Sequence, residues 1–368
     1  MTKLRDICRF QSGGTPSRGT PAYFNGNVPW ITTVALNGDV IDGNQAIEWI
    51  TGEAIAKSAA KIVPPHSVMV GTRVGIGKVA INSVPMSTSQ DIISLIGIDE
   101  NKWDKKFICH LITANKEHLT SQARGATIKG IKIEAIADLV LPEISLKEQA
   151  RISEVIGKVD ALMHMHQQMA MNLEQLIKSR FIELFGDIVL NPFGWEKDYL
   201  GVVCDVRDGT HDSPHYHSTG FPLVTSKNVT GGEIDLTDCS LISEADFNKI
   251  NERSKVNMGD IIMPMIGTVG KPVIVNVEPN FAIKNVSLIK FKDDSRVLNT
   301  FVRSLLQSDY FDDAVLSKVR GGTQKFISLG DIRKLAVIVP PMELQEQFAA
   351  FVEQTDKSKL CSKMEVAA

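Results

Sequence analysis

The hydrophobic positions along the chain follow two different periods. In residues 1–143, and again in residues 196–341, short apolar runs rich in β-branched side chains alternate with Gly, Pro and Asn, which is typical of strands joined by turns. Between these regions, residues 146–185 contain no proline and place apolar side chains three and four positions apart, which predicts a helix. The pattern therefore predicts two mixed α/β regions separated by one long helix.

The strand-like runs recur in the same order in the two α/β regions. They are residues 67–70, 79–81 and 91–96 in the first region, and residues 260–263, 272–275 and 285–289 in the second. Helical stretches follow late in each region, at residues 107–119 and 300–311. The matching order favours one fold that is present twice.

The central helix carries a continuous apolar stripe. Its members are Ile152, Val155, Val159, Leu162, His166, Met169, Leu173 and Leu176, with a flanking row of Ile156, Met163, Ala170, Ile177 and Leu184. The second row widens the stripe, so the helix is expected to face more than one neighbour. At ~1.5 Å per residue the helix would be about 60 Å long, which suits a spacer between two domains.

Short motifs repeat at a nearly constant distance. The segments Val28-Pro29-Trp30-Ile31-Thr32, Gly77-Lys78 and Ser94-Leu95-Ile96 return 193 residues later as Phe221-Pro222-Leu223-Val224-Thr225, Gly270-Lys271 and Ser287-Leu288-Ile289. The segment Arg124-Gly125-Ala126-Thr127 returns 196 residues later as Arg320-Gly321-Gly322-Thr323. So small a drift indicates a duplicated module, and two modules give a rough two-fold symmetry that suits duplex DNA. The loops differ, since Thr15-Pro16-Ser17-Arg18 stands opposite Thr210-His211-Asp212-Ser213, as reading two different half-sites would need.

The second module is followed by the beginning of the same helix. Phe348, Phe351, Val352 and Asp356 stand 196 residues after Ile152, Val155, Ile156 and Asp160. The apolar stripe fades after Asp356, and the equivalent of Phe185 would be position 381 of a 368-residue sequence. We therefore expect a second helix that is short or frayed. Phe348, Phe351 and Val352 are expected to pack antiparallel against the end of the central helix, near residues 176–184.

Composition places the chain among ordinary folded proteins. Hydrophobic residues make up 43% of it and charged residues 23%, no apolar run approaches the ~18 residues of a membrane span, and the N-terminal residues do not resemble a signal peptide. Five cysteines form no CxxC pair, so neither a disulfide framework nor a zinc site is expected. A cytoplasmic location follows as an expectation.

The net charge does not by itself indicate a nucleic-acid-binding protein. The chain carries −3 overall; residues 1–143 have 15 basic and 13 acidic side chains, and residues 191–342 have 17 and 19. Any contact with DNA phosphates must therefore use a local basic surface, or a partner that supplies more of the charge.

The sequence segments that come nearest to a nucleotide-binding, a methyltransferase or a metal-binding motif are each incomplete. Gly75-Ile76-Gly77-Lys78 and Gly267-Thr268-Val269-Gly270-Lys271 lack the spacing and the hydroxyl residue of a phosphate loop. Asn191-Pro192-Phe193 lacks the second proline of a methyltransferase motif, and His211, His215 and His217 have no regular ligand spacing. We expect no catalytic residue, cofactor or metal, and the glycines are better explained as turns that leave Lys78 and Lys271 available for phosphate.

The ordered set of motifs, present twice, resembles the specificity subunit of type I restriction-modification enzymes. The further carriers are Leu4-Arg5-Asp6-Ile7-Cys8 and Leu200-Gly201-Val202-Val203-Cys204, Gly14-Thr15 and Gly209-Thr210, Lys147-Glu148-Gln149-Ala150-Arg151-Ile152, and Phe181-Ile182-Glu183-Leu184-Phe185-Gly186-Asp187. The resemblance covers nearly the whole chain. No single motif is specific, but their order is.

The resemblance implies an α/β (α+β) protein with two target-recognition domains, residues 1–143 and 188–342, each reading one half of a split DNA sequence. It implies that the spacer helices, residues 144–187 and a shortened 343–368, pack as an antiparallel coiled-coil-like pair. These helices would set the distance between half-sites and bind two methyltransferase subunits, which motor-nuclease subunits join. The specificity subunit itself would perform no chemistry.

Candidate DNA contacts come from the repeated basic and hydroxyl positions. They are Thr15, Ser17, Arg18, Thr32, Arg73, Lys78, Arg124, Lys129, His211, Thr225, Lys227, Lys271, Arg320 and Lys325. Arg124 and Arg320 precede glycines that allow close approach to a phosphate, although a salt bridge closing each module explains them too. Arg73 has no basic twin, so it is a candidate for reading sequence in one domain. The candidate helix or partner interface consists of Ile152, Val155, Val159, Leu162, Leu173, Leu176, Phe348 and Phe351.

Two rival interpretations remain open on the sequence. One is a truncated or silent variant of the same family, with impaired partner docking. The other is a duplicated scaffold that binds carbohydrate or peptide and no nucleic acid. Copurification with an adenine methyltransferase and a DNA pull-down would separate the three.

Overall fold

The computed structural model describes residues 1–38, 40–125, 129–230, 232–266, 270–315 and 326–367. It divides the chain into two compact units, Met1–Leu162 and Met163–Ala368, and each is described by itself. Two predicted DNA contacts, Arg320 and Lys325, lie outside the described residues.

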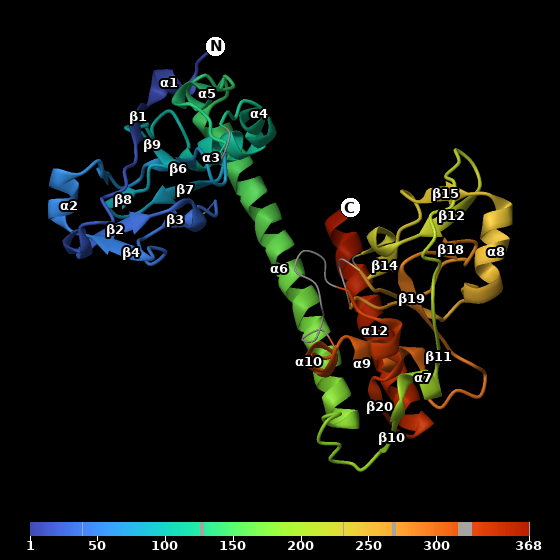
Figure 1. The fold of residues 1–368 in the computed structure, drawn as a ribbon. Helices are drawn as coiled ribbons and strands as arrows, with labels where there is room; N and C mark the ends of the chain where they lie inside the picture. The colour runs from blue at the N-terminus through green and yellow to red at the C-terminus, as the bar shows by residue number, and fades with distance from the viewer. Residues whose placement is uncertain (39, 126–128, 231, 267–269, 316–325, 368) are drawn as a thin grey trace. The chain divides into compact units, whose positions relative to one another are not determined.

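The first unit is a mixed α/β domain followed by the beginning of the long helix (Figure 1). Its helical elements are α1 (Leu4–Ile7), η1 (Pro21–Tyr23), η2 (Thr33–Ala35), α2 (Gly52–Lys57), α3 (Lys105–Ala114), α4 (Lys116–Ser121), α5 (Ile133–Ala137) and the N-terminal part of α6 (Leu146–Phe185). Its strands are β1 (Arg9–Ser12), β2 (Phe24–Ile31), β3 (Val40–Ile41), β4 (Glu48–Ile50), β5 (Ile62–Val63), β6 (Val68–Gly71), β7 (Val79–Asn82), β8 (Met86–Thr88) and β9 (Ile92–Ile96).

Two sheets build this domain. One has the order β1-β9-β6-β7-β3 and the other β4-β2-β8-β5. Successive residues of β6 point to opposite faces of the sheet: Val68 and Val70 join a core cluster with Ile108 of α3, whereas Met69 joins a cluster with Ile31 of the second sheet. Both faces of the first sheet are therefore buried, which explains why its strands read as continuous apolar runs.

The second unit contains the rest of α6 and a second α/β domain. Its further helical elements are α7 (Leu200–Val203), η3 (Ser226–Asn228), α8 (Glu244–Ser254), α9 (Asn299–Leu306), α10 (Asp309–Ala314), α11 (Leu329–Arg333) and α12 (Met342–Ala367). Its strands are β10 (Glu196–Tyr199), β11 (Asp205–Asp208), β12 (Phe221–Val224), β13 (Val229–Thr230), β14 (Glu233–Ile234), β15 (Ser240–Ile242), β16 (Ile261–Pro264), β17 (Val273–Ile274), β18 (Ala282–Ile283), β19 (Val286–Lys290) and β20 (Ala336–Val339).

The two domains share one topology, as the repeat predicts. The order β11-β19-β16-β17 repeats β1-β9-β6-β7, and β15-β12-β18 repeats β4-β2-β8. Even a single bridge is reproduced, because Lys3 pairs with Val140 in the first domain, and their counterparts in the repeat, Tyr199 and Ala336, pair in the second. The domains differ at the sheet edge, where β3 pairs with β7 but its counterpart β14 pairs with β13.

The registers correct one detail of the sequence alignment. The cross-strand pairs Val68–Ile81 and Ile261–Ile274 confirm the 193-residue offset for β6 and β7. In the next strand the pairs are Val68–Leu95 and Ile261–Ile289, an offset of 194. Leu95 is thus equivalent to Ile289 and not to Leu288, whose side chain faces the opposite core cluster.

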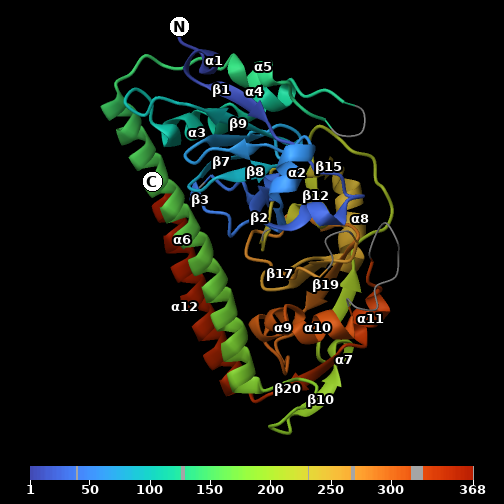
Figure 2. The ribbon, with the colours of Figure 1, turned by 90° about the vertical axis from the view of Figure 1, so that its left-hand side faces the viewer.

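Helix α6 is unbroken from Leu146 to Phe185, so the prediction of one continuous helix over residues 152–184 is confirmed. In the second unit its C-terminal part and α12 run side by side in opposite directions (Figures 1 and 2). Lys359 of α12 pairs with Glu174 of α6 at 3.2 Å. The C-terminal helix is shorter than α6, as predicted, but its backbone stays helical to Ala367. Of the two expected alternatives, a short or a frayed helix, the structure shows the short one, and Lys357 pairs with Glu353 where the apolar stripe fades.

Four phenylalanines hold the end of α6 in the second unit. Phe181 and Phe185 of α6 meet Phe301 of α9 and Phe348 of α12, with ring centroids 4.9–5.6 Å apart. Phe348 is fully buried, as expected for the helix seam, and Val352 joins the same core. The burial predicted for Phe351 was only partly right, since its half-buried ring lies 5.9 Å from the guanidinium of Arg180.

Among the described residues, no helix combines the length and the apolar character needed to cross a membrane.

Candidate nucleic-acid interface

Two loops of the first domain bring predicted basic residues together. One is the β6–β7 turn, which carries Arg73 and Lys78, and the other is closed by reciprocal backbone hydrogen bonds of 2.9 and 3.0 Å between Arg124 and Gly130. The loops are joined where the amide of Ile131 donates to the carbonyl of Thr72 at 2.8 Å. A Cβ on Gly130 would lie 2.8 Å from Cγ of Arg73, so any larger residue there would displace the Arg73 side chain.

The β6–β7 turn depends on two glycines with left-handed backbone conformations. Gly75 and Gly77 have φ of +75° and +76°, which favours glycine at both positions. The Lys78 side chain lies against Gly75, and the Lys116 side chain lies against Gly77. Lys116, the first residue of α4, is a basic neighbour that the sequence analysis missed, because only the fold brings α4 to this turn.

The charges of this cluster are largely uncompensated. Arg73 is half exposed and lies 3.6 Å from a carboxylate oxygen of Asp91. Lys78, Lys116, Arg124 and Lys129 are exposed, and none of the carboxylates in the described part of the chain forms an ion pair with them. The interpretation of Arg124 as a salt bridge finds no support there. Five cations, four on the two loops and Lys116 at the start of α4, form a surface suited to phosphate.

Arg18 is held within its own domain. Its guanidinium forms a forked ion pair with Glu48, one arm of which measures 2.8 Å, and stacks over Phe24 with its carbon 4.7 Å from the ring centroid. The hydrogen bonds to Glu48 raise the pKa of Arg18 and lower the pKa of Glu48. Both terminal nitrogens of the Arg18 guanidinium already bind Glu48, so Arg18 is less available to a phosphate than the unpaired cations of the basic loops.

The other candidates of this domain lie around the second sheet. Thr15 and Thr32 are half-buried and Ser17 is exposed. Thr15 follows Gly14, where a Cβ would lie 2.1 Å from the carbonyl oxygen of Ala59, and Gly14 accepts a hydrogen bond from the indole of Trp30 at 3.0 Å. This packing fixes the position of the loop that carries Ser17.

In the second domain the loop after β11 is tied down by a polar network. The imidazole of His211 contacts Asn285 through Nδ1 at 3.0 Å and Asp208 through Nε2 at 2.9 Å. Arg253 of α8 also binds Asp208, which is buried. The hydrogen bonds with Asn285 and Asp208 raise the pKa of His211 above its ordinary value, because both acceptors favour the doubly protonated ring.

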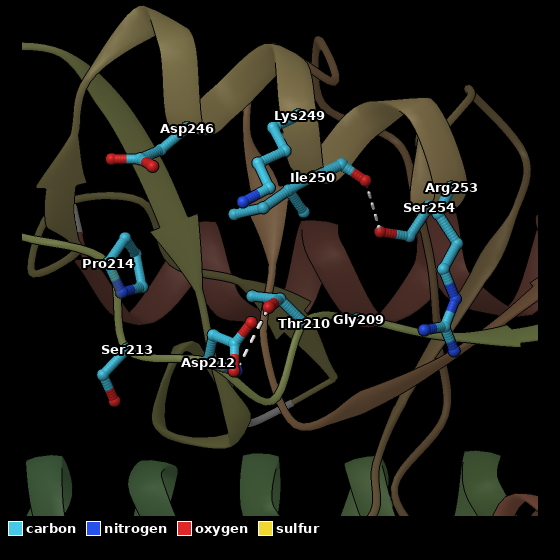
Figure 3. A pocket seen from close by; sticks show the side chains of 10 residues that line it. All are labelled: Gly209, Thr210, Asp212, Ser213, Pro214, Asp246, Lys249, Ile250, Arg253 and Ser254. Carbon is cyan, nitrogen blue, oxygen red and sulfur yellow. Dashed lines mark hydrogen bonds between the residues drawn. The ribbon is translucent and has the colours of Figure 1, made fainter.

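A pocket of about 190 Å³ opens between this loop and α8 (Figure 3). Lys249 and Arg253 line its α8 side, and Asp212 and Ser213 line its loop side. The amide of Asp212 donates to the hydroxyl of Thr210 at 3.2 Å, which bends the loop. The lining carries both signs of charge, unlike the basic loops of the first domain.

The remaining candidates of the second domain divide into internal and exposed groups. The hydroxyl of Thr225 donates to Asn228 at 2.9 Å and belongs to the cap of η3. Lys227 is exposed and lies 3.7 Å from Asp238. Lys271 is exposed as well. Of these three, the two lysines present a side chain that a ligand can reach without breaking a hydrogen bond.

The apolar stripe of α6 is uneven. Val155, Val159, Leu162 and Leu176 are each about half exposed, whereas Ile152 and Leu173 are half-buried. Met163, Met165, Met169 and Met171 of the same helix are exposed as well. Methionine is flexible and polarisable and suits surfaces that adapt to a partner.

Groups that could perform chemistry do not gather in the described residues. No three His, Cys, Asp or Glu side chains there converge as metal ligands would. Burial raises the pKa of Cys8 and of its repeat equivalent Cys204 to about 12, so neither thiol is a ready nucleophile. The described residues thus form two domains of one topology, each with polar or basic loops, and a long helix that follows the first.

Comparison with known proteins places the chain within a family. The family described as Type I restriction modification DNA specificity domain matches residues 1–175 and 192–364. The chain belongs to this family, and the prediction of a specificity subunit is confirmed.

Curated relatives match either most of the chain or somewhat less than half of it. The specificity subunit of the type I restriction enzyme MjaIX from Methanocaldococcus jannaschii is 25% identical over 377 residues, covering 96% of this chain and 85% of the relative. The EcoR124I/EcoR124II specificity subunit from Escherichia coli is 30% identical over 166 residues, covering 43% and 40%. A crystal structure of the S subunit from M. genitalium has the same fold, with a TM-score of 0.58 at 16% identity, over 100% of this chain and 91% of that one.

Proposed function

We propose that this protein is the DNA-recognition subunit of a type I restriction-modification complex and that each domain reads one half of a split duplex sequence. The observation that carries the proposal is the repeated domain followed by a long helix, in a chain that belongs to the specificity family over nearly its full length. Specificity subunits are non-catalytic components of such complexes, and methylation and cleavage would reside in partner subunits. The complex would act in the cytoplasm, where the DNA is.

The first domain would meet DNA through its basic loops. Arg124, Lys129, Lys78 and Lys116 would contact phosphates, because they are exposed cations on, or beside, loops shaped by glycine. Arg73, at the edge of this cluster, would reach a base edge, since arginine can bind guanine with two hydrogen bonds. Phosphate contacts position a domain, whereas base contacts specify the sequence.

The second domain would read its half-site with the loop after β11 and α8. His211 and Asp212 stand at the position of Pro16 and Ser17 in the repeat, so different chemistry would face DNA in the two halves. Lys227 and Lys271 would supply phosphate contacts.

The exposed stripe of α6 would bind the methyltransferase subunits. Its half-exposed apolar side chains are Val155, Val159, Leu162 and Leu176. Exposed apolar side chains of this kind often mark a surface that binds another protein. A spacing between half-sites of about one helical turn, ~10 bp, is expected by analogy with two-fold DNA-binding dimers.

The test uses the chain copurified with its methyltransferase partner and a pool of random duplex DNA. Sequencing of the bound fraction should give two short half-sites separated by an unspecified spacer. Replacing loop 72–78 together with loop 124–130 should change one half-site only. A silent variant would copurify with the partner poorly and select nothing, and a carbohydrate- or peptide-binding scaffold would show no affinity for the pool at any salt concentration.

A further inference from the structure

A buried glutamine lies at the beginning of α6. Gln149 is 1% exposed. Its amide oxygen accepts a hydrogen bond from the backbone N–H of Asp104 at 3.0 Å, and its amide nitrogen donates to the carbonyls of Lys102 and Ile144 at 3.1 and 3.2 Å. Asp104 is the N-cap residue of α3, so one side chain fastens the first turn of α6 to the start of the last large helix of the first domain.

The second domain contains the same arrangement. Gln345, the repeat equivalent of Gln149, is fully buried in the first turn of α12. Its amide oxygen accepts from the N–H of Leu298 at 2.8 Å, and its amide nitrogen donates to the carbonyls of Arg296 and Pro340 at 3.0 and 2.8 Å. Leu298 is the N-cap residue of α9. All three bonds reach equivalent places in the fold, although the N-cap residue has changed from aspartate to leucine.

Only a glutamine amide satisfies these partners. The two carbonyls need N–H donors and the backbone N–H needs an acceptor, which an amide supplies and which neither a carboxylate nor a thioether can supply together. Because each glutamine is buried and both polar atoms of its amide are paired, the loss of the amide leaves buried or partly buried backbone groups without that partner. We call Gln149 with its partners the first joint, and Gln345 with its partners the second joint. A further hydrogen bond, from the hydroxyl of Ser153 to the Asp104 carboxylate at 2.8 Å, supports the first joint.

A small change of angle at this joint moves the far end of the helix by a large distance. A tilt of about 5° at one end of a ~60 Å helix moves the other end by about 5 Å, more than the ~3.4 Å between base pairs. The direction in which each helix leaves its domain therefore matters to any ligand that both domains must reach.

We propose that Gln149 and Gln345 are positioning residues that hold each long helix at a fixed angle to the domain before it and thereby fix the spacer length between half-sites. The inference rests on the proposed function, since a spacer length exists only if both domains read DNA. It goes beyond that function by assigning the spacing to two side chains that touch no ligand.

The test compares two isosteric variants in the full chain with its methyltransferase partner. Gln149→Met removes the joint. Asn82→Leu is the matched control, because Asn82 is also a fully buried amide with backbone partners, accepting from Ser67 and donating to Pro64 and Val84, but lies within the sheet of the same domain. Both variants should melt at a lower temperature than the parent. The random duplex pool is then bound to each variant, and the half-sites and their spacing are sequenced.

The expected result is that Gln149→Met keeps both half-sites but accepts spacers one base pair longer and shorter, with the parent's preference for one spacer reduced about tenfold. Asn82→Leu should keep the single spacer. An unchanged spacer in Gln149→Met, or equal broadening in both variants, would overturn the inference. If Gln149→Met does not fold, Ser153→Ala and Gln345→Met carry the same test. Failure of the proposed function is distinguishable, since the unaltered protein itself would then select no split sequence.

Discussion

The two recognition domains share their strands and their glutamine joint but handle charge in opposite ways. In the first, four cations on or beside adjoining loops have no ion-pair partner among the described residues. In the second, the loop after β11 is internally neutralised, because Asp208 binds both His211 and Arg253. The comparison teaches that duplication preserved the scaffold while the loops diverged, as expected of two domains that read different half-sites.

The two glutamine joints differ in how deeply the neighbouring apolar side chain of the helix is buried. Phe348 is buried in the cluster of four phenylalanines, whereas its repeat equivalent Ile152 is half-buried. The second helix is therefore anchored by apolar packing in addition to Gln345, and the first depends more on Gln149.

The largest effect should separate the two joints. Phe348→Ala should lower the free energy of unfolding by about 3–5 kcal/mol, and Ile152→Ala by only about 1 kcal/mol, because one side chain is fully buried and the other is not. Denaturant unfolding of the full chain measures both. Equal losses would show that the joints are equivalent. Phe351→Asp should cost less than Phe348→Asp, since the Phe351 ring reaches the surface.

Sequence readout by the first domain is the next largest effect. Arg73→Ala should weaken binding to the selected DNA by about 1–3 kcal/mol and relax one position of one half-site. Titration with single-base variants of that DNA measures this. Uniform weakening on every sequence would instead make Arg73 a phosphate contact.

Phosphate contacts should appear in the salt dependence. Arg124→Ala and Lys129→Ala should each reduce the slope of log K against log salt by about one unit on all sequences. Lys57→Ala is the control of equal charge, because Lys57 pairs with Glu53 on α2. Unchanged slopes for the loop variants would remove this loop from the interface.

The hydrogen bonds of His211 should give the second domain a pH dependence of stability near neutral pH. Since hydrogen bonds with Asn285 and Asp208 raise the pKa of His211 in the folded state, its contribution to stability is complete below the unfolded value of about 6.5 and is lost as pH rises through the folded pKa. His211→Gln should flatten the unfolding midpoint across that window, and Asn285→Ala should move the loss to lower pH. A midpoint curve identical to the parent's would mean that the network does not titrate.

The smallest effect concerns Arg18. Glu48→Gln should change stability little, because exposed ion pairs contribute little, but it should free the Arg18 fork and raise affinity for DNA of any sequence by no more than a few-fold. Arg18→Gln in the same background should reverse the gain. Filter binding at low salt would detect it.

The duplication and the long helix could be predicted from the sequence because each shows as a pattern in the order of residues along the chain. Apolar residues spaced three and four positions apart predict α6 without knowledge of its tertiary contacts. Motifs that recur in the same order at a nearly constant distance reveal the repeat. The one-residue shift in β9 could not be predicted, since it depends on which core each strand face packs against.

Which basic residues are free, and what fixes the joints, were decided by the tertiary structure. Arg18 lies in a turn and is bound by Glu48 of β4, Lys116 is brought to a turn by the packing of α4, and Gln149 finds two of its partners far earlier in the chain. Periodicity reports only how a segment relates to its own neighbours. Hydrogen bonds and charge pairs form between whichever groups the folded chain brings within about 3 Å, and that proximity exists only once the sheets and helices have packed.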